Sequence, residues 1–142
     1  STRGSRMDLN RQGEESIMRE EILLTPTPVF KDTAATHRQP ATEATETLPF
    51  TRLDIAVMIY NLEAAASLSA TFSIETSMQN KDDDDDLWVP LITYTAITSA
   101  TPPLLIADGA TAKILRYIRW KLVLAGTTPK AAFSIAGIAT RA

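Results

Sequence analysis

The stretch that most constrains this chain is 111–126, TAKILRYIRWKLVLAG. Apolar side chains fill most of one parity, and Lys113, Tyr117, Arg119 and Lys121 fall on the other. This period of two indicates a β-strand with one buried face, because the same charges at helical spacing would scatter around the cylinder. The run closes on a Gly-Thr-Thr-Pro turn, so we expect a central strand of an antiparallel sheet. The side chains on its expected buried face are Ala112, Ile114, Ile118, Trp120, Leu122 and Leu124.

Other stretches repeat this pattern along the chain. Residues 48–64 and 67–78 alternate most clearly, and shorter apolar runs lie within 87–97, 104–106 and 130–142. No segment shows convincing helical periodicity. About six to eight strands separated by turn residues predict an all-β fold, an antiparallel β-sandwich of the jelly-roll or immunoglobulin-like type.

Two glycines refine the strand predictions. Asp108-Gly109 predicts a turn directly after the short strand at 104–106. Gly137 predicts a bulge in the last strand, which would move Ile138 onto the core face.

Composition limits the classes of partner and of compartment. The 142 residues carry a net charge of −3 with a pI near 5.1, so we expect neither nucleic acid nor membrane as a partner. The chain has no cysteine, which excludes a disulfide scaffold and a thiolate nucleophile or metal ligand. Its 44% hydrophobic content suffices for one packed core. Neither a secretion signal nor a membrane-length apolar run is present, so we expect synthesis and assembly in the cytoplasm.

The N-terminal part predicts an extended arm. Residues 1–6 read as the remnant of an expression tag, and residues 7–47 as an arm with a polar connection. The apolar segment 21–30 holds two prolines, which remove backbone donors and exclude a central strand. The Thr-rich stretch 31–47 predicts a long loop, so the arm would dock away from the first strand of the body at 48–142, on the same or on another subunit. The candidate interface residues are Ile22, Leu23, Leu24, Pro26, Pro28, Val29 and Phe30.

Little in the chain indicates catalysis. The run Asp82–Asp86 could offer oxygens to calcium, but adjacent aspartates diverge and spacer glycines are missing, so we expect a solvated hairpin tip that blocks edge pairing. His37, the only histidine, lies in the polar connection without a positioned partner. The sequence contains no nucleophile elbow, no glycine-rich phosphate loop and no evident pair of catalytic carboxylates. We therefore expect no enzyme, no metal site and no cofactor.

Aromatic residues leave a binding function open. Trp88 and Tyr117 would form a sugar-stacking platform if both were exposed on one sheet face, with Tyr94 and Trp120 as further candidates. The competing interpretation places Trp120 in the core with Trp88 as its cap.

A modest basic stripe lies on the central strand. Its members are Arg116, Arg119 and Lys121, and Glu75 and Asp54 are available on neighbouring strands. Cross-strand ion pairs are therefore the expected use of these charges.

Three motifs follow one another near the C-terminus. A segment of the type R-Y-hydrophobic-R-hydrophobic lies at Arg116–Trp120, a Gly-Thr-Thr-Pro turn at Gly126–Pro129, and a phenylalanine-containing strand at Phe133–Ala136. They are preceded by the apolar LLTPTPVF, a polar connection and the strands LDIAVMIY and ATFSIETS. Over roughly residues 20–142 this arrangement resembles small β-sandwich structural proteins of tailed bacteriophages. The aspartate run departs from that group, which often carries a Ser-Pro-Asp-Gly-type turn there.

The resemblance implies a non-enzymatic capsid decoration or accessory protein, assembled in the host bacterial cytoplasm and carried on the virion. Its partners would be further copies of itself, often as a trimer, and the major capsid protein or another virion protein. The arm would grip a neighbouring subunit or the shell. Two other hypotheses stay open: a carbohydrate-binding β-sandwich module, and a scaffold or shell-associated cargo protein of a bacterial compartment.

Overall fold

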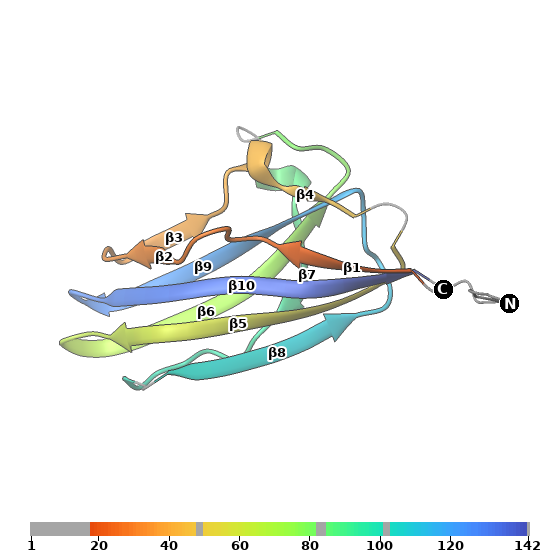
Figure 1. The fold of residues 1–142 in the computed structure, drawn as a ribbon. Coiled ribbons are helices and arrows are strands. Elements are labelled where there is room, and N and C mark those ends of the chain that lie inside the picture. Colours follow the sequence, from red (N-terminus) through yellow and green to blue (C-terminus); the bar gives the residue numbers. More distant parts are fainter. Residues whose placement is uncertain (1–17, 48–49, 82–84, 101–102, 142) are drawn as a thin grey trace, which may run out of the picture.

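Two antiparallel β-sheets lie face to face (Figure 1). The computed structural model describes residues 18–47, 50–81, 85–100 and 103–141. The strands are β1 (Met18–Leu23), β2 (Val29–Lys31), β3 (Ala35–Arg38), β4 (Thr45–Glu46), β5 (Arg52–Glu63), β6 (Ala66–Ser77), β7 (Val89–Thr93), β8 (Leu104–Ala110), β9 (Tyr117–Thr127) and β10 (Lys130–Arg141). Two short 3-10 helices, η1 (Ala41–Glu43) and η2 (Asp85–Leu87), complete the described elements.

The strands divide equally between the sheets. Sheet I has the order β1-β10-β5-β8, with β2 also paired to β10. Sheet II has the order β3-β9-β6-β7, with β4 also paired to β9. The predicted antiparallel β-sandwich is confirmed, with more strands than the sequence pattern indicated. No helix within the described ranges has the length and apolar character needed to cross a membrane.

The core lies between the sheets and draws on both. Phe72 of β6 and Trp120 of β9 pack edge-on against Phe133 of β10, with ring centroids 5.0 and 5.2 Å from that ring. The expected central strand is confirmed as β9, which lies between β6 and the short strands β3 and β4. It begins at Tyr117, later than predicted, and its even-numbered apolar residues face sheet I.

Residues 18–47 differ from the predicted arm and loop, because they contribute four strands to the two sheets. β1 and β2 pair with β10, and β3 and β4 pair with β9. Pro26 and Pro28 lie between β1 and β2, where the ladder requires no donor from them. The backbone of this apolar segment therefore finds its hydrogen-bond partners within its own chain. Residues 1–6 and 7–17 lie outside the described residues.

Two glycines lie where strands approach closely. Gly109 is within β8 and opposite Asp54 of β5, so the predicted turn at Asp108-Gly109 is wrong. Gly137 keeps a regular register with β5 and Ile138 is 49% exposed, so the predicted bulge is also wrong. A Cβ atom on Gly137 would clash with the carbonyl oxygen of Asp54. The missing side chain permits this close approach between β10 and β5.

Candidate functional site

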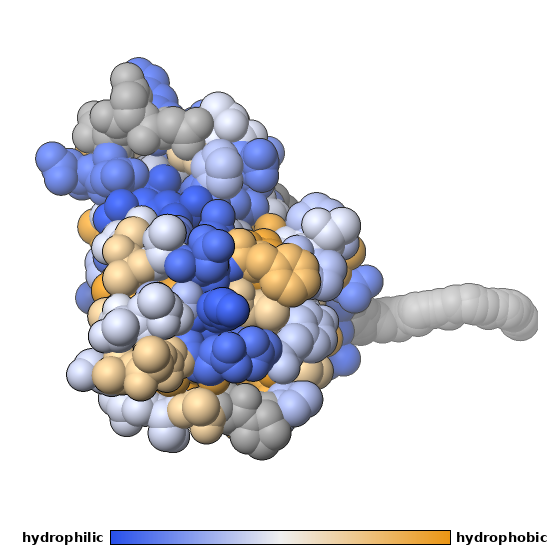
Figure 2. Space-filling view, turned by 90° about the vertical axis from the view of Figure 1, so that its left-hand side faces the viewer, coloured by the Kyte–Doolittle hydropathy of each residue, from blue (hydrophilic) through white to orange (hydrophobic). Residues whose placement is uncertain are grey.

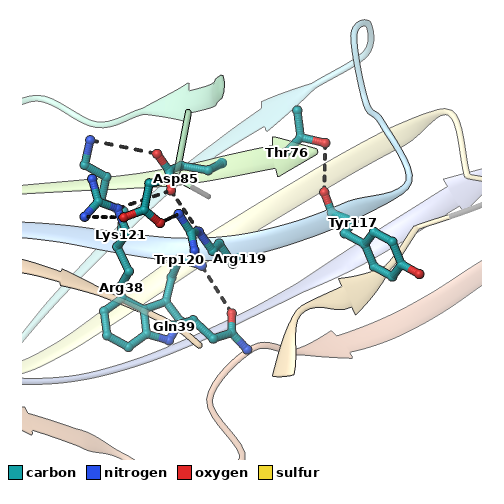
Figure 3. A network of polar contacts seen from close by, with 9 residues as sticks. Arg38, Gln39, Thr76, Asp85, Tyr117, Arg119, Trp120 and Lys121 are labelled. Carbon is teal, nitrogen blue, oxygen red and sulfur yellow. Dashed lines mark hydrogen bonds and ion pairs between the residues drawn. The ribbon is translucent and has the colours of Figure 1, made fainter. Parts of the chain in front are cut away.

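The most concentrated group of charged side chains lies on the outer face of sheet II (Figure 3). Arg119 of β9 is 1% exposed and donates from Nε to Glu75 Oε1 at 3.0 Å and from Nη2 to Asp85 Oδ1 at 2.8 Å. Arg38 Nη1 lies 3.4 Å from Asp85 Oδ2, and Lys121 Nζ lies 3.9 Å from Glu75 Oε2. We call these five side chains the polar cluster. It joins β3, β6 and β9 to η2.

Trp88 covers Arg119, the most buried member of the polar cluster. The Arg119 Cζ atom lies 4.3 Å from the centroid of the Trp88 ring, and the tryptophan is 5% exposed. The backbone N–H of Trp88 donates to the carbonyl oxygen of Asp85, which positions the residue directly after η2. A desolvated cation over an indole ring is stabilised by about 2 kcal/mol. The Trp88 ring thus explains why Arg119 is buried, although it lies on the expected polar face of β9.

The electrostatics of the polar cluster favour a structural role. The hydrogen bond from Arg119 holds the pKa of Asp85 below its usual value, and the charges of Arg38 and Lys121 act in the same direction against the effect of burial. A carboxylate held ionised and engaged by two guanidinium groups is poorly suited to general acid chemistry. The polar cluster therefore fastens η2 to sheet II.

The predicted ion pairs are found in part. The cross-strand pair between Arg119 and Glu75 is confirmed, with Arg119 buried. Asp54, by contrast, pairs with Arg52 of its own strand at 2.9 Å. Arg116 Nε lies 2.9 Å from Glu46 Oε2 of β4, and both side chains are about half exposed.

Gln39 joins the N-terminal strands to the rest of the sandwich, although no sequence pattern identified it. Its Nε2 donates to the carbonyl oxygens of Leu24 at 3.1 Å and Glu43 at 2.9 Å. Its Oε1 accepts the backbone N–H of Trp120 at 3.2 Å (Figure 3). The residue is 5% exposed, so these bonds satisfy a buried amide. Its partners are distant in sequence, which is why spacing alone could not reveal the role.

The predicted interface segment is divided between core and surface. Ile22 and Leu24 are 5% and 2% exposed and belong to the core of their own chain. Leu23 and Phe30 are 56% and 74% exposed. Because alternate residues of a strand point to opposite sides, only Leu23 of β1 and Phe30 of β2 remain strongly available for outside contacts among these four.

The other predicted interface residues lie between β1 and β2 and at the start of β2. Pro26 and Pro28 are exposed, and Val29 is partly buried against the core. β2 lies toward the end of the molecule that faces the viewer in Figure 2, where hydrophobic surface is interrupted by hydrophilic surface. A shallow pocket of about 350 Å³ beside it is lined by Phe30, Lys31, Asp32, Asn61, Lys130, Ala131 and Ala132.

The predicted sugar platform is not presented as an open aromatic surface. Trp88 is almost fully buried over Arg119. Tyr117 is half-buried, and the Arg116 Cζ atom lies 5.1 Å from the centroid of its ring. Tyr94 is buried, its hydroxyl donates to the carbonyl oxygen of Ile55 at 2.7 Å, and burial raises its pKa. These aromatic side chains therefore serve packing and cation contacts.

The remaining candidates for chemistry have local contacts. The Nε2 atom of His37 lies 2.8 Å from the carbonyl oxygen of Thr33. Asp82, Asp83 and Asp84 lie outside the described residues, whereas Asp85 is bound in the polar cluster and differs from the solvated tip that the sequence predicted. Within the part of the chain that the structure describes, no group of three or more histidine or acidic residues could hold a metal ion.

The outer face of sheet I is open, and its exposed apolar side chains lie beside Glu21, Arg52 and Asp54. Leu23 of β1 and Met58 of β5 are 56% and 37% exposed. Leu105 of β8 and Ile138 of β10 are 56% and 49% exposed. Each of these four side chains comes from a different strand of the order β1-β10-β5-β8. The buried residues that precede or follow them in sequence point into the core. We call this surface the open face.

A groove of about 420 Å³ crosses the open face. Ala136, Ala56 and Ala107 stand opposite one another on β10, β5 and β8, so this row carries only methyl groups across three strands and ends at Leu23 of β1. Small side chains there leave a depression between the larger residues on either side. The groove is lined by Asp54, Ile55, Ala56, Ala107, Asp108, Gly109, Gly137 and Ile138.

Known proteins resemble this chain in structure. No family model matches it, and no curated protein matches it. The PBSX exported protein XepA superposes with a TM-score of 0.52 at 17% identity, over 84% of this chain and 36% of XepA. A structure of the infectious bursal disease virus Gx strain gives a TM-score of 0.49 at 13% identity, over 92% of this chain and 34% of that one. The chain thus spans about a third of each protein's length, and the likeness to XepA concerns the fold.

Proposed function

We propose that this protein is a non-catalytic structural subunit of a virion, a capsid decoration or accessory protein that acts through protein contacts of sheet I. The observation that carries the proposal is the open face, on which Leu23, Met58, Leu105 and Ile138 are between 37% and 56% exposed. Exposed apolar surface bordered by polar residues is typical of a protein contact site. Its partners are further copies of this chain and a shell protein.

The sequence and the fold support this proposal. The chain resembles small β-sandwich proteins of tailed bacteriophages in its order of motifs, and its sandwich fold is shared with XepA, a PBSX exported protein. The most concentrated charges, in the polar cluster, are paired with one another. A rigid sandwich with such a closed cluster and an open apolar face suits assembly better than catalysis.

The contacts in this proposal differ from those of a gripping arm. Ile22 and Leu24 are buried in their own core, and β1 is paired along its length with β10. The N-terminal strands therefore stabilise the subunit, while the face and edges of sheet I serve assembly.

The first experiment asks whether the chain belongs to particles. Virus-like particles are banded on a density gradient from the culture that produces the protein, and their peptides are identified by mass spectrometry. We expect this chain in the particle band at a fixed ratio to the shell protein. Its absence from washed particles would contradict the proposed function.

The second experiment tests the open face with a matched pair of variants. Met58→Glu changes sheet I and Val123→Glu changes the outer face of sheet II, at residues that are 37% and 38% exposed. We expect Met58→Glu to abolish incorporation and Val123→Glu to retain it, because a charge in a desolvated apolar contact is costly. If both variants fold and are incorporated into particles to the same extent, the open face is not the contact surface.

A further inference from the structure

β8 forms one border of sheet I and carries few features that prevent pairing, although its Gly109 N–H donates to Asp108 Oδ1 at 2.7 Å and would exchange this partner on pairing. It is the last strand in the order of that sheet and lies at the lower border in Figure 1. Its seven residues pair with β5 in a regular register. Leu105, Ala107, Asp108 and Gly109 are exposed. A regular edge strand presents a row of unpaired backbone donors and acceptors along its free side, which is a template for another strand.

The other borders of the two sheets carry features that discourage pairing. β1 has three charged residues in succession, Arg19, Glu20 and Glu21. β7 contains Pro90, and its register with β6 shifts between Ile74 and Glu75. β3 and β4 are only four and two residues long. Charges, proline, register shifts and short length are the usual protections of edge strands, and β8 contains only one charge.

The side chains of β8 complement a second copy of the same strand. Ala107 is the midpoint of Leu104–Ala110, so antiparallel pairing about Ala107 overlaps the whole strand. In that register Leu105 of each copy stands opposite Gly109 of the other on the open face. A large side chain thus meets a position without one, beside the Asp54 carboxylate, whose Oδ1 would lie 2.7 Å from a Cβ atom on Gly109. The adjacent groove provides room for the leucine over Ala56 and Ala107.

Neighbouring registers fit less well. Centring the pair on Asp108 would place two carboxylates directly opposite each other, which is unfavourable. Centring it on Ile106 would set Gly109 opposite Pro103, which has no N–H to donate. The register about Ala107 avoids both, and it leaves the two Asp108 carboxylates in a diagonal relation.

We propose that β8 pairs with β8 of a second copy, antiparallel and centred on Ala107, so that two copies of sheet I form one continuous sheet. This contact deepens the proposed function and rests on it, because it names the subunit interface that assembly would use. It also makes the two open faces continuous across the pair.

The absence of cysteine from the sequence allows a direct test. Directly opposed residues of antiparallel strands have Cα atoms about 4.5 to 5.5 Å apart, within the range of a disulfide. Under mild oxidation we expect Ala107→Cys to give a covalent dimer on a non-reducing gel. Ala35→Cys, at an exposed alanine of the β3 edge in sheet II, is the control and should stay uncrosslinked.

Two further substitutions test the register by light scattering over a concentration series. Leu105→Glu should abolish the dimer, whereas Leu87→Glu, at a 42% exposed leucine of η2, should not. Asp108→Asn keeps an oxygen that can accept the Gly109 N–H and removes the diagonal repulsion. We expect it to raise the association constant by roughly one-and-a-half- to fivefold.

The outcomes separate this contact from the proposed function. Particles that contain the chain while Ala107→Cys fails to crosslink would overturn the β8 contact and leave the proposed function intact. A dimer that forms equally well with Leu105→Glu would also overturn it. A crosslinked dimer that is absent from particles would support the contact and contradict the virion role.

Discussion

The two sheets of this sandwich have outer faces of opposite character. On sheet II, Arg119 and Glu75 are 1% and 4% exposed, although alternation assigns both to the outside. On sheet I, Met58 and Leu105 are 37% and 56% exposed, although both are apolar. The burial of an outer face thus depends on what covers it. Trp88 and η2 cover the charged face, and no described element of the chain covers the apolar one to the same degree.

This difference indicates which kind of contact stabilises each outer face. A buried charge requires compensation within the same chain, because an unpaired charge away from water costs several kcal/mol. Exposed apolar side chains cost little in the isolated subunit and become favourable when another surface removes them from water. The polar cluster is therefore completed during folding, while the open face would gain its contacts in the proposed assembly.

The largest effect should come from breaking the polar cluster. We expect Arg119→Leu to lower the free energy of unfolding by about 3 kcal/mol, because it leaves Glu75 buried without its principal partner. This value is at the low end of the roughly 3 to 5 kcal/mol that breaking a buried ion pair costs. The reason is that Arg38 Nε and Lys121 Nζ remain 3.8 and 3.9 Å from the Glu75 carboxylate. Urea denaturation measures the change.

The exposed pair between Arg116 and Glu46 provides the control. It has a similar distance of 2.9 Å but side chains that are 48% and 52% exposed. Arg116→Leu should leave the free energy of unfolding almost unchanged, because an exposed ion pair in water contributes little. Equal losses for Arg119→Leu and Arg116→Leu would show that burial does not distinguish the two outer faces.

A smaller effect should follow from removing the amide that spans the two sheets. Gln39→Ala leaves the carbonyl oxygen of Leu24 and the N–H of Trp120 without this partner, so we expect a loss of about 2 kcal/mol. His37→Ala, two residues away and partly exposed, should cost less than about 0.5 kcal/mol. Hydrogen exchange would test the same point, since opening of β1 to β4 should increase in Gln39→Ala alone.

The smallest effect concerns acid stability. Since the folded state lowers the pKa of Asp85, its contribution is present above the ordinary carboxyl value of about 4 and is lost as pH falls through the lower folded value. Asp85 is 47% exposed, so the contribution should be only about 0 to 1 kcal/mol. We expect Asp85→Asn to be less stable than the native chain at pH 6, with the difference shrinking as the pH falls below about 4. A difference that grew on acidification would contradict this sign.

Much of the fold could be predicted from local sequence patterns, whereas the open face could not. Alternation around Trp120 and Phe133 identified core strands correctly, and Thr128 and Pro129 lie in the predicted turn. Local patterns failed at Gly109 and Gly137, because a glycine that permits close strand approach resembles one that makes a turn or bulge.

The sequence by itself determined an all-β sandwich and predicted its central strand at 111–126, which the structure places at 117–127, because side-chain alternation and turn residues are properties of neighbouring positions. Only the tertiary structure decided that residues 18–47 complete both sheets, that Trp88 covers Arg119, and that the outer face of sheet I stays open. These features depend on which distant strands become neighbours and on what lies over each face. The free energy of burying a charge or an apolar side chain is set by that cover, which no single stretch of sequence contains.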